Sequence, residues 1–285
     1  MMDLIEEFSM FLAQSGKSEN TIKTYVLNVQ QYLQWFDDTY GLELNRLHRE
    51  NILDYKAYLL HVQKHKGRHL NAKTINGRLS ALCSFNRFLI HKGIQSDVVV
   101  DKQDFVKVQI EYANPCTIQK ADVERFRQKI LEAGDKRLYA LVTILAYAGL
   151  RISEALDIKL SDLNLQMKEL VVRKGKGGKQ RLVYLNSKIV TAVREYLRTR
   201  KSDSEYLFAS RESERVDRTV INKLFKRFSD TITPHMLRHF YCSRCLESGY
   251  SIHEIAAQAG HRDLKTTLIY TNPSREEMKR KAELL

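Results

Sequence analysis

A chain of 285 residues, 43% hydrophobic and 28% charged, has the composition of a globular protein and enough length for two domains. Its formal net charge of +13 favours a polyanionic partner, either a nucleic acid or an anionic membrane surface. No apolar run reaches the ~18 residues of a membrane-spanning helix, and the start lacks the basic region of a signal peptide. We therefore expect neither an integral membrane protein nor a secreted one, but a soluble cytoplasmic protein.

The positive charge is unevenly distributed along the chain. Residues 1–100 hold 12 basic and 10 acidic side chains, so most of the surplus lies in residues 101–285. The four cysteines, Cys83, Cys116, Cys242 and Cys245, are too few for a disulfide framework in a chain of this length, and we expect reduced thiols.

Residues 1–100 read as four helices. In the segment 21–36, apolar residues recur at intervals of three and four, behind Asn20 as the expected N-cap. The segments 2–13, 51–62 and 73–91 carry similar patterns. A small helical domain is the economical interpretation.

A basic stretch lies between the third and fourth of these helices. We expect a loop at 64–69, followed by a helix that carries further basic residues. Taken alone, such a basic run is interpreted as a solvated loop and helix face. Its basic residues are Lys64, Lys66, Arg68, Lys73, Arg78 and Arg87.

A linker is expected where Asn114-Pro115 would interrupt a helix. We place the first domain at 1–98, the linker at 99–116 and the second domain at 117–285. In the second domain, strands at 169–173 and 180–185 should form a hairpin around the Gly- and Lys-rich tip 174–179. The expected helices span 119–133, 136–148, 152–158, 187–200, 217–228, 234–248, 251–259 and 264–270.

The last third of the chain carries polar residues suited to a phosphodiester. Thr233 as N-cap and Pro234 at the first position start a helix, so we expect His235 and Arg238 both to lie in its first turn and to share a face. The amide groups of a helix start already favour an anion. His261 follows a glycine helix stop, and Tyr270 comes nine residues later. A tyrosine needs nearby cations to act as a nucleophile at neutral pH.

Four motifs occur in order: Gly149-Leu-Arg-x-Ser-Glu, Gly175-Lys-Gly-x-Lys, His235-x-Leu-Arg-His, and Gly260-His-x-x-Leu-x-Thr-Thr-x-x-Tyr. With these motifs the sequence resembles the tyrosine site-specific recombinases, the family of phage integrases and Xer recombinases. The resemblance covers the second domain fully, and it extends to the first through the Ser18-x-x-Thr21-x-x-x-Tyr25 helix start. It implies a mainly α-helical fold with a small β-sheet, in which a helical, SAM-like core-binding domain precedes a mixed α+β catalytic domain.

Residue by residue, the resemblance implies six catalytic positions. Two arginines would hold the scissile phosphate, Tyr270 would attack it to form a 3′-phosphotyrosyl link, and a hairpin lysine would protonate the leaving 5′-oxygen. One histidine would assist proton transfer and the other would support the phosphate. The arginines take the role that a metal ion has in many nucleases, so no cofactor, metal or ATP is implied. The six residues are Arg151, Lys176, His235, Arg238, His261 and Tyr270.

The resemblance also implies partners. The two domains would clamp duplex DNA at a specific recombination site. The DNA contacts that the resemblance implies are Lys64, Lys66, Arg68, Lys73, Arg78 and Arg87 of the first domain and the hairpin lysines Lys174 and Lys179. The tail 274–285 would dock on a neighbouring protomer to form a homotetramer on two DNA sites. A heterologous recombinase or accessory protein remains open as a further partner, and the setting would be the bacterial nucleoid.

Several alternatives stay open. Lys174 and Lys179 compete with Lys176, and only the family register selects Lys176. The histidines and cysteines of 235–245 imitate a zinc site, but ligands on consecutive turns of one helix cannot close a tetrahedron, so Cys242 and Cys245 are better explained as core residues. A type IB topoisomerase would also suit the basic two-domain layout, but the small helical first domain and the tail favour recombination. A DNA-binding regulator without the chemistry would lack at least one of the six residues, and none is lost. Among recombinases, the linker and the 174–179 tip favour a transposon cointegrate resolvase over an integrase or an Xer protein that resolves chromosome dimers.

Overall fold

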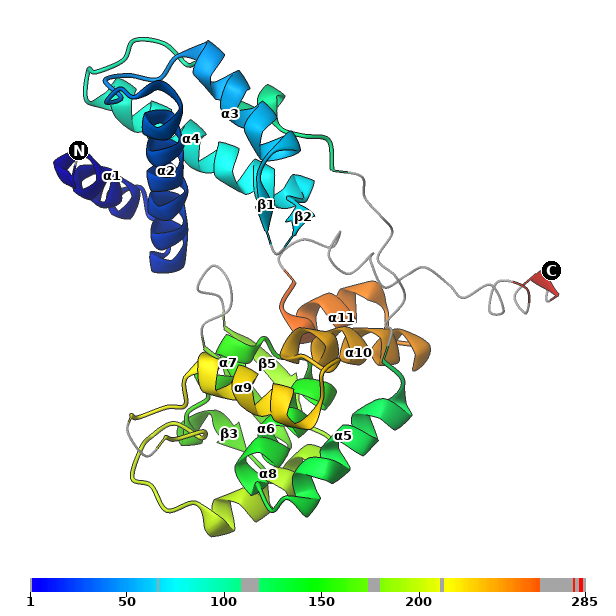
Figure 1. The fold of residues 1–285 in the computed structure, drawn as a ribbon. Coiled ribbons are helices and arrows are strands. Elements are labelled where there is room, and N and C mark those ends of the chain that lie inside the picture. Colours follow the sequence, from blue (N-terminus) through cyan, green and yellow to red (C-terminus); the bar gives the residue numbers. More distant parts are fainter. Residues whose placement is uncertain are drawn as a thin grey trace. The chain divides into compact units, whose positions relative to one another are not determined.

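The computed structural model describes residues 2–65, 67–108, 118–173, 180–210 and 213–261, together with 279, 282 and 283. The contacts within the chain divide it into two compact units, Met1–Ile110 and Glu111–Leu285 (Figure 1). Among the described residues, no helix combines the length and the apolar character needed to cross a membrane.

The first unit contains the four expected helices, drawn from blue to cyan in Figure 1. They are α1 (Met2–Gln14), α2 (Glu19–Tyr40), α3 (Arg49–His61) and α4 (Ala72–His91). The expected cap of the second helix is wrong. Ser18 is the N-cap, since its hydroxyl accepts the backbone N–H of Thr21 at 3.3 Å, and Asn20 lies inside the helix. Ser18 is extended and bonds three residues ahead, as an N-cap requires.

Two very short strands replace the loop expected at 64–69. β1 (Lys64–His65) pairs antiparallel with β2 (Arg68–His69), and His65 lies opposite Arg68. A two-residue strand is too short to show the alternation of apolar and polar residues by which strands are recognised. Its side chains are exposed, so the pairing presents basic residues to solvent.

The segment that follows α4 is fastened to the first unit. Val99 and Val100, inside the expected linker 99–116, are buried in its core. A 3₁₀ turn, η1 (Lys102–Asp104), follows, and Arg49 binds Asp104 at 2.6 Å. Three amide side chains each bind the backbone through both a donor and an acceptor: Gln95 to Leu47, Asn86 to Asp97 and Val99, and Asn76 to Val106.

The second unit is mixed α and β, as expected. Its helices are α5 (Lys120–Glu132), α6 (Lys136–Ala148), α7 (Ile152–Leu156), α8 (Ser187–Thr199), α9 (Arg218–Phe228), α10 (Pro234–Glu247) and α11 (Ile252–Ala259), with a 3₁₀ turn η2 (Leu160–Asp162). The helix expected at 264–270 lies outside the described residues.

The sheet of this unit has three strands in the order β3-β4-β5. β4 (Glu169–Val172) and β5 (Arg181–Tyr184) form the expected hairpin, with Val172 opposite Arg181. The sequence did not indicate β3 (Leu163–Asn164), which pairs with the start of β4 and is again only two residues long.

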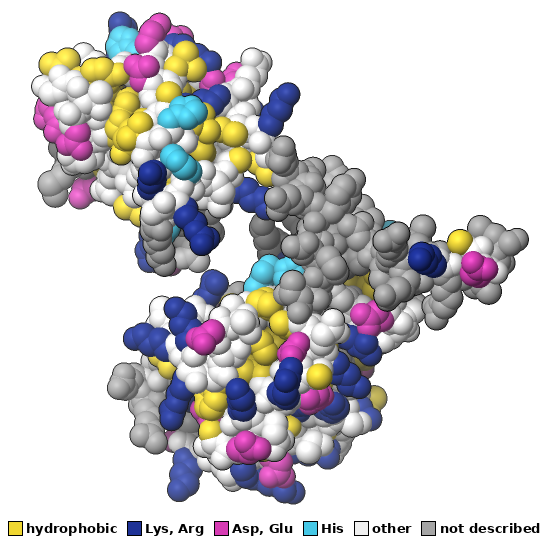
Figure 2. Space-filling view, turned by 45° about the vertical axis from the view of Figure 1, so that its right-hand side comes forward, with side chains coloured by type: hydrophobic (Ala, Val, Ile, Leu, Met, Phe, Trp, Pro, Cys, Tyr) yellow, Lys and Arg dark blue, Asp and Glu magenta, His cyan; other side chains and the backbone are white. Residues whose placement is uncertain are grey.

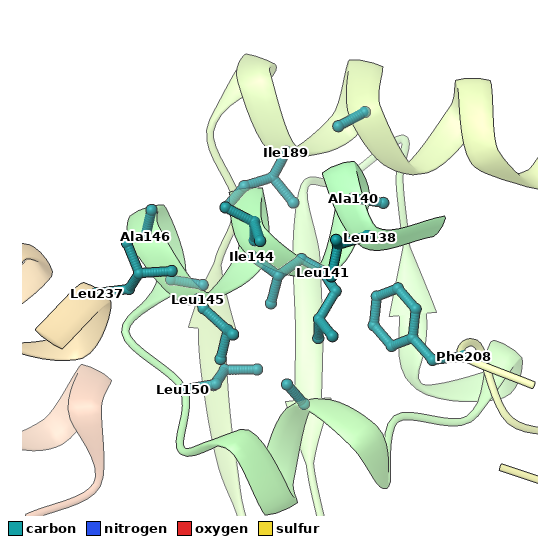
Figure 3. Close-up of a cluster of buried hydrophobic side chains, with 14 of the residues drawn as sticks. Leu138, Ala140, Leu141, Ile144, Leu145, Ala146, Leu150, Ile189, Phe208 and Leu237 are labelled. Carbon is teal, nitrogen blue, oxygen red and sulfur yellow. The ribbon is translucent and has the colours of Figure 1, made fainter. Parts of the chain in front are cut away.

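Helix α6 is the centre of the second unit's core. Its apolar residues point to several sides and pack against Ile189 of α8, against Leu237 of α10, and against Phe208, which lies between α8 and α9 (Figure 3). A helix that is apolar on most sides is expected where it is buried on most sides. Because α6 ends at Gly149, this packing fixes the position of the segment that carries Arg151.

The cysteines of α10 pack as expected from their size. Cys242 and Cys245 are buried in a small apolar cluster with Ile255 and Ala259 of α11. This contact joins α10 to α11, so the segments that hold Arg238 and His261 are attached to one another.

Candidate functional site

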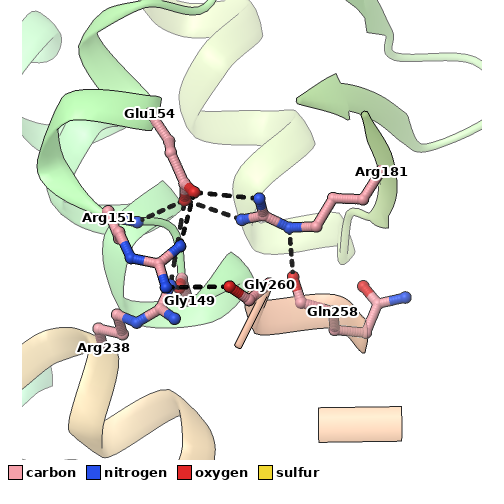
Figure 4. Close-up of polar contacts among 7 residues, drawn as sticks. All are labelled: Gly149, Arg151, Glu154, Arg181, Arg238, Gln258 and Gly260. Atoms are coloured by element: carbon pink, nitrogen blue, oxygen red, sulfur yellow. Dashed lines mark hydrogen bonds and ion pairs between the residues drawn. The ribbon is translucent and has the colours of Figure 1, made fainter. Parts of the chain in front are cut away.

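The site is organised around the carboxylate of Glu154 on α7, whose side chain is 3% exposed (Figure 4). It accepts the backbone N–H of Arg151 at 2.9 Å and the Arg151 side chain at 2.8 Å. Arg181 of β5 binds both of its oxygens, at 3.0 and 2.8 Å. Burial alone would raise the pKa of Glu154, but the hydrogen bonds and charges of Arg181 and Arg151 outweigh burial and lower it. The carboxylate is therefore ionised and anchors two guanidinium groups.

Arg238 enters the site from α10. Thr233 caps this helix, since its hydroxyl accepts the N–H of Met236 at 3.3 Å, and Pro234 is its first residue. His235 lies in the first turn as expected, whereas the expectation for Arg238 is wrong, because it begins the second turn. The Arg238 side chain is 5% exposed, donates to the carbonyl oxygen of Gly149 at 2.6 Å and lies 4.0 Å from Glu154. Three guanidinium groups thus surround one carboxylate.

Gly149 is required by its surroundings. Its φ is +64°, and a Cβ there would lie 2.1 Å from the ring of Tyr241. Only glycine combines this left-handed conformation with so close an approach. The carbonyl that holds Arg238 is therefore placed by a residue that cannot be replaced without moving it.

Three histidines lie beside the arginines. The Nε2 atoms of His235 and His239 are 2.8 Å apart, so one ring donates and the other accepts. Burial lowers the pKa of His239 to about 4, and the charges of His235 and Arg238 act in the same direction. Burial also lowers the pKa of His261 to about 4, with Arg238, Arg151 and Arg181 contributing. Both rings are therefore neutral at pH 7.

The fold brings together four of the six predicted catalytic residues. Arg151 and Arg238 meet at Glu154, His235 and Arg238 share the start of α10, and His261 directly follows the Gly260 end of α11. Lys176 and Tyr270 lie outside the described residues. The described side chains form a partly buried, positively charged cluster beside the imidazoles of His235 and His261, which suits a phosphodiester.

Two family models match this chain. The Phage integrase family matches residues 117–277, more than half of the chain, and the phage integrase N-terminal SAM-like domain matches residues 5–93. The chain belongs to the phage integrase family of tyrosine recombinases. As a member, the recombinase is a DNA breaking-rejoining enzyme that carries out site-specific recombination.

Named relatives align with the recombinase over nearly all of its length. The TnP I resolvase of Bacillus thuringiensis is 50% identical and covers 100% of both chains. The tyrosine recombinase XerA of Pyrococcus horikoshii is 30% identical, with 99% of this chain and 93% of the relative aligned.

Solved structures of the family share the fold. The crystal structure of XerA recombinase is 25% identical, with a TM-score of 0.53 and coverage of 99% and 98%. The Tn1549 transposon integrase, solved with circular intermediate DNA, gives a TM-score of 0.73 at 19% identity, with 98% of each chain covered.

The predicted DNA-binding residues of the first unit differ in their surroundings. Lys64, Arg68, Lys73 and Arg87 are exposed. Lys73 and Arg87 lie within ~40° of each other around α4, taking 100° per residue. Arg78 points elsewhere, is half-buried and donates to Gln63.

The other DNA-binding candidates are Lys66, Lys174 and Lys179, which lie outside the described residues. Figure 2 shows Lys and Arg side chains spread over the visible face of the second unit, with Asp and Glu between them. The recombinase thus shows a broadly basic surface on this unit.

Three residues of the site received no role from the sequence. His239 and Glu154 stand within the motifs but were given no function there. The spacing of three residues between Arg151 and Glu154 could have indicated their ion pair. Arg181 lies in the strand expected at 180–185, where nothing in the sequence indicated that its side chain would be buried. Its side chain is only 12% exposed because it pairs with Glu154.

The pH dependence of the recombinase's stability should reflect the lowered pKa of His239. An unfolded histidine titrates near ~6.5, whereas the pKa of His239 is about 4 in the fold. Between these values the unfolded chain binds more protons, so stability should fall as pH decreases from ~6.5 towards 4 and should be unaffected above that window. His239→Asn should therefore lose less thermal stability than the wild type between pH 7.5 and pH 5. The exposed His253→Asn variant is the control, and an unchanged pH response in His239→Asn would contradict the prediction.

Proposed function

We propose that the recombinase acts at a specific DNA site of a mobile element, with resolution or integration of that element as the outcome. Support comes from the 50% identity with the TnP I resolvase over the full length of both chains. The single structural observation that carries the chemistry is the meeting of Arg151 and Arg238 at Glu154, next to His235 and His261.

In the proposed reaction, the Tyr270 hydroxyl attacks the scissile phosphorus and the 5′-oxygen leaves. His235 takes up the tyrosine proton, and Lys176 protonates the leaving oxygen. Arg151 and Arg238 stabilise the charge of the transition state, and His261 donates a hydrogen bond to the phosphate. The products are a 3′-phosphotyrosyl link and a free 5′-hydroxyl. A 5′-hydroxyl of the partner strand reverses the step, which leads through a Holliday junction without ATP.

The proposed organisation follows the same resemblance. Residues 1–98 bind core DNA, 99–116 link the domains, and 117–285 form the catalytic domain. The tail 274–285 joins four protomers on two DNA sites, and the exposed lysines and arginines of 64–87 contact the duplex. The setting is the bacterial cytoplasm at the nucleoid.

A suicide substrate tests this function. The bound site is first mapped by protection of DNA from the source element, and a nick is then placed next to the scissile phosphate so that the cleaved strand diffuses away. We expect the wild type to accumulate a covalent protein–DNA adduct on a denaturing gel, and Tyr270→Phe to form none. Tyr250→Phe, which changes an exposed tyrosine of the same unit, should behave as wild type. A wild-type protein that binds the site without forming adduct would contradict the proposed function. Adduct formed by Tyr270→Phe would rule out Tyr270 as the nucleophile.

A further inference from the structure

Arg181 joins three segments of the chain that lie far apart in sequence. Its Nη1 and Nη2 donate to the two oxygens of Glu154, and its Nε donates to the carbonyl oxygen of Gln258 at 3.0 Å. Gln258 returns a second contact to the same strand, since its side-chain oxygen accepts the N–H of Tyr184 at 3.3 Å. Arg181 therefore fixes β5 both to α7 and to the end of α11 (Figure 4).

All three nitrogens of Arg181 are engaged within the protein, and its side chain is 12% exposed. Arg151 differs from it. Its side chain is 31% exposed, and it shares only one nitrogen with Glu154 while another donates to the carbonyl oxygen of Gly260 at 2.9 Å. Its Nε donates to no residue in the part of the chain that the structure describes. Of the two guanidinium groups on Glu154, Arg151 is thus the one with donors left for a ligand.

Arg181 also lies against the peptide that holds Arg151. A Cβ on Gly260, whose φ is +70°, would lie 2.6 Å from the Arg181 guanidinium. The Gly260 carbonyl binds Arg151, and His261 is the next residue. Movement of Arg181 would therefore be transmitted to both neighbours.

The charges explain why a second arginine is needed on Glu154. With Arg181 absent, the buried carboxylate would keep Arg238 at 4.0 Å, but its two oxygens would be free to accept two parallel N–H bonds from Arg151, the geometry that arginine and carboxylate prefer. Arg151 would then turn towards Glu154, and its charge would be neutralised by its closest neighbour. With Arg181 present, both oxygens already accept its N–H groups, and the Arg151 side chain keeps a single bond to Glu154 beside the backbone N–H bond of the same residue.

We propose that Arg181 is a positioning residue for strand cleavage: by occupying both oxygens of Glu154 it limits the Arg151 guanidinium to one bond with that carboxylate, so that the remaining donors of Arg151 are available to the scissile phosphate. This inference rests on the proposed function. It requires the fork of an arginine, because lysine offers a point charge that cannot bind two carboxylate oxygens and the Gln258 carbonyl together.

The test compares Arg181→Gln and Arg181→Lys on the suicide substrate. Both should cleave about 100-fold more slowly than the wild type, the usual consequence of misplacing a catalytic group, while binding to the site changes little. Arg173→Gln is the matched control. Arg173 directly follows the adjacent strand β4 and pairs with the buried Asp162 instead of Glu154, so its loss should leave the cleavage rate unchanged. Thermal unfolding of each variant shows whether it is folded, and Arg181→Lys keeps the test valid if Arg181→Gln is not.

A second substrate separates positioning from a general structural role. A methylphosphonate at the scissile position replaces one charged oxygen by a neutral methyl group, so an arginine that stabilises that charge becomes dispensable. The methylphosphonate has two diastereomers, and the relevant one is that on which Arg151→Ala recovers cleavage. On it, the Arg181 variants should recover in parallel. On the ordinary substrate, the double variant Arg151→Ala/Arg181→Gln should cleave no more slowly than Arg151→Ala alone.

The outcomes are distinguishable. Equal defects of the Arg181 variants on both substrates, or additive losses in the double variant, would overturn the positioning role. Wild-type cleavage by Arg181→Lys would show that charge suffices and would overturn the fork. If the wild type itself forms no adduct, the proposed function fails, and this inference falls with it.

Discussion

Arg238→Ala should lower the rate of strand cleavage by about a thousandfold, the upper range for loss of one preorganised donor at a developing negative charge. The side chain is buried and already held by Gly149, so it is presented to the phosphate without reorganisation. The measurement is the rate of adduct formation at saturating protein on the suicide substrate. Arg238→Lys should recover only a small part of the loss, because a lysine lacks the planar fork.

The control for Arg238 lies on the same helix. Arg244 is exposed and pairs with Glu247, so Arg244→Ala should cleave as the wild type does. Removal of a buried arginine also weakens the fold, and the rate must therefore be measured at a temperature where thermal unfolding shows each variant to be folded. Cleavage by Arg238→Ala within tenfold of the wild type would contradict the assignment.

Glu154→Ala should cause the largest loss of stability. Removing one partner of a buried ion pair typically costs about 3–5 kcal/mol, because the remaining charges stay buried without compensation. Here the remaining charges are those of Arg151, Arg181 and Arg238, which would repel one another. The midpoint of urea unfolding, with its slope, measures this free energy.

Glu247→Ala is the matched control for Glu154→Ala. It also removes one partner of a glutamate–arginine pair on a helix, but the pair is exposed, and such pairs are worth about 0–1 kcal/mol. If Glu154→Ala destabilised the protein no more than Glu247→Ala, Glu154 would not be the anchor that the geometry indicates.

The helices of this protein could be predicted because their signals are local. The N-cap Thr233 with Pro234, the capping box that begins at Ser251, and the glycine stops at 149 and 260 all appear within a few residues of the helix end that they define. The two-residue strands β1, β2 and β3 could not be predicted, because they are too short to show the alternation of apolar and polar residues that marks a strand. The cap at Ser18 was missed because Asn20, an equally suitable residue, stands two positions away.

The residues of the site also fall into two groups, those that motifs in the sequence indicate and those that only the packing of the fold brings in. The ordered motifs supplied Arg151, His235, Arg238 and His261, whose chemistry is typical of the family. Arg181 could not be assigned from the sequence, because an arginine on a short strand is ordinarily exposed. Its partners, Glu154 and Gln258, are 27 and 77 residues away, and only the packing of α7, β5 and α11 brings them together.

The two carbonyls that hold Arg238 and Arg151 belong to Gly149 and Gly260, which end the helices α6 and α11. The carboxyl end of a helix carries a partial negative charge from the aligned peptide dipoles, which stabilises a nearby cation by ~0.3–1 kcal/mol, and by up to ~2 kcal/mol where it is partly buried. Arg238 and Arg151 are therefore each stabilised by the partial negative charge of a helix end, in addition to the Glu154 carboxylate that they share with Arg181. The cluster keeps a net positive charge for its substrate. A site with carboxylates in place of these two carbonyls would hold its arginines as firmly and would repel the phosphate that it must bind.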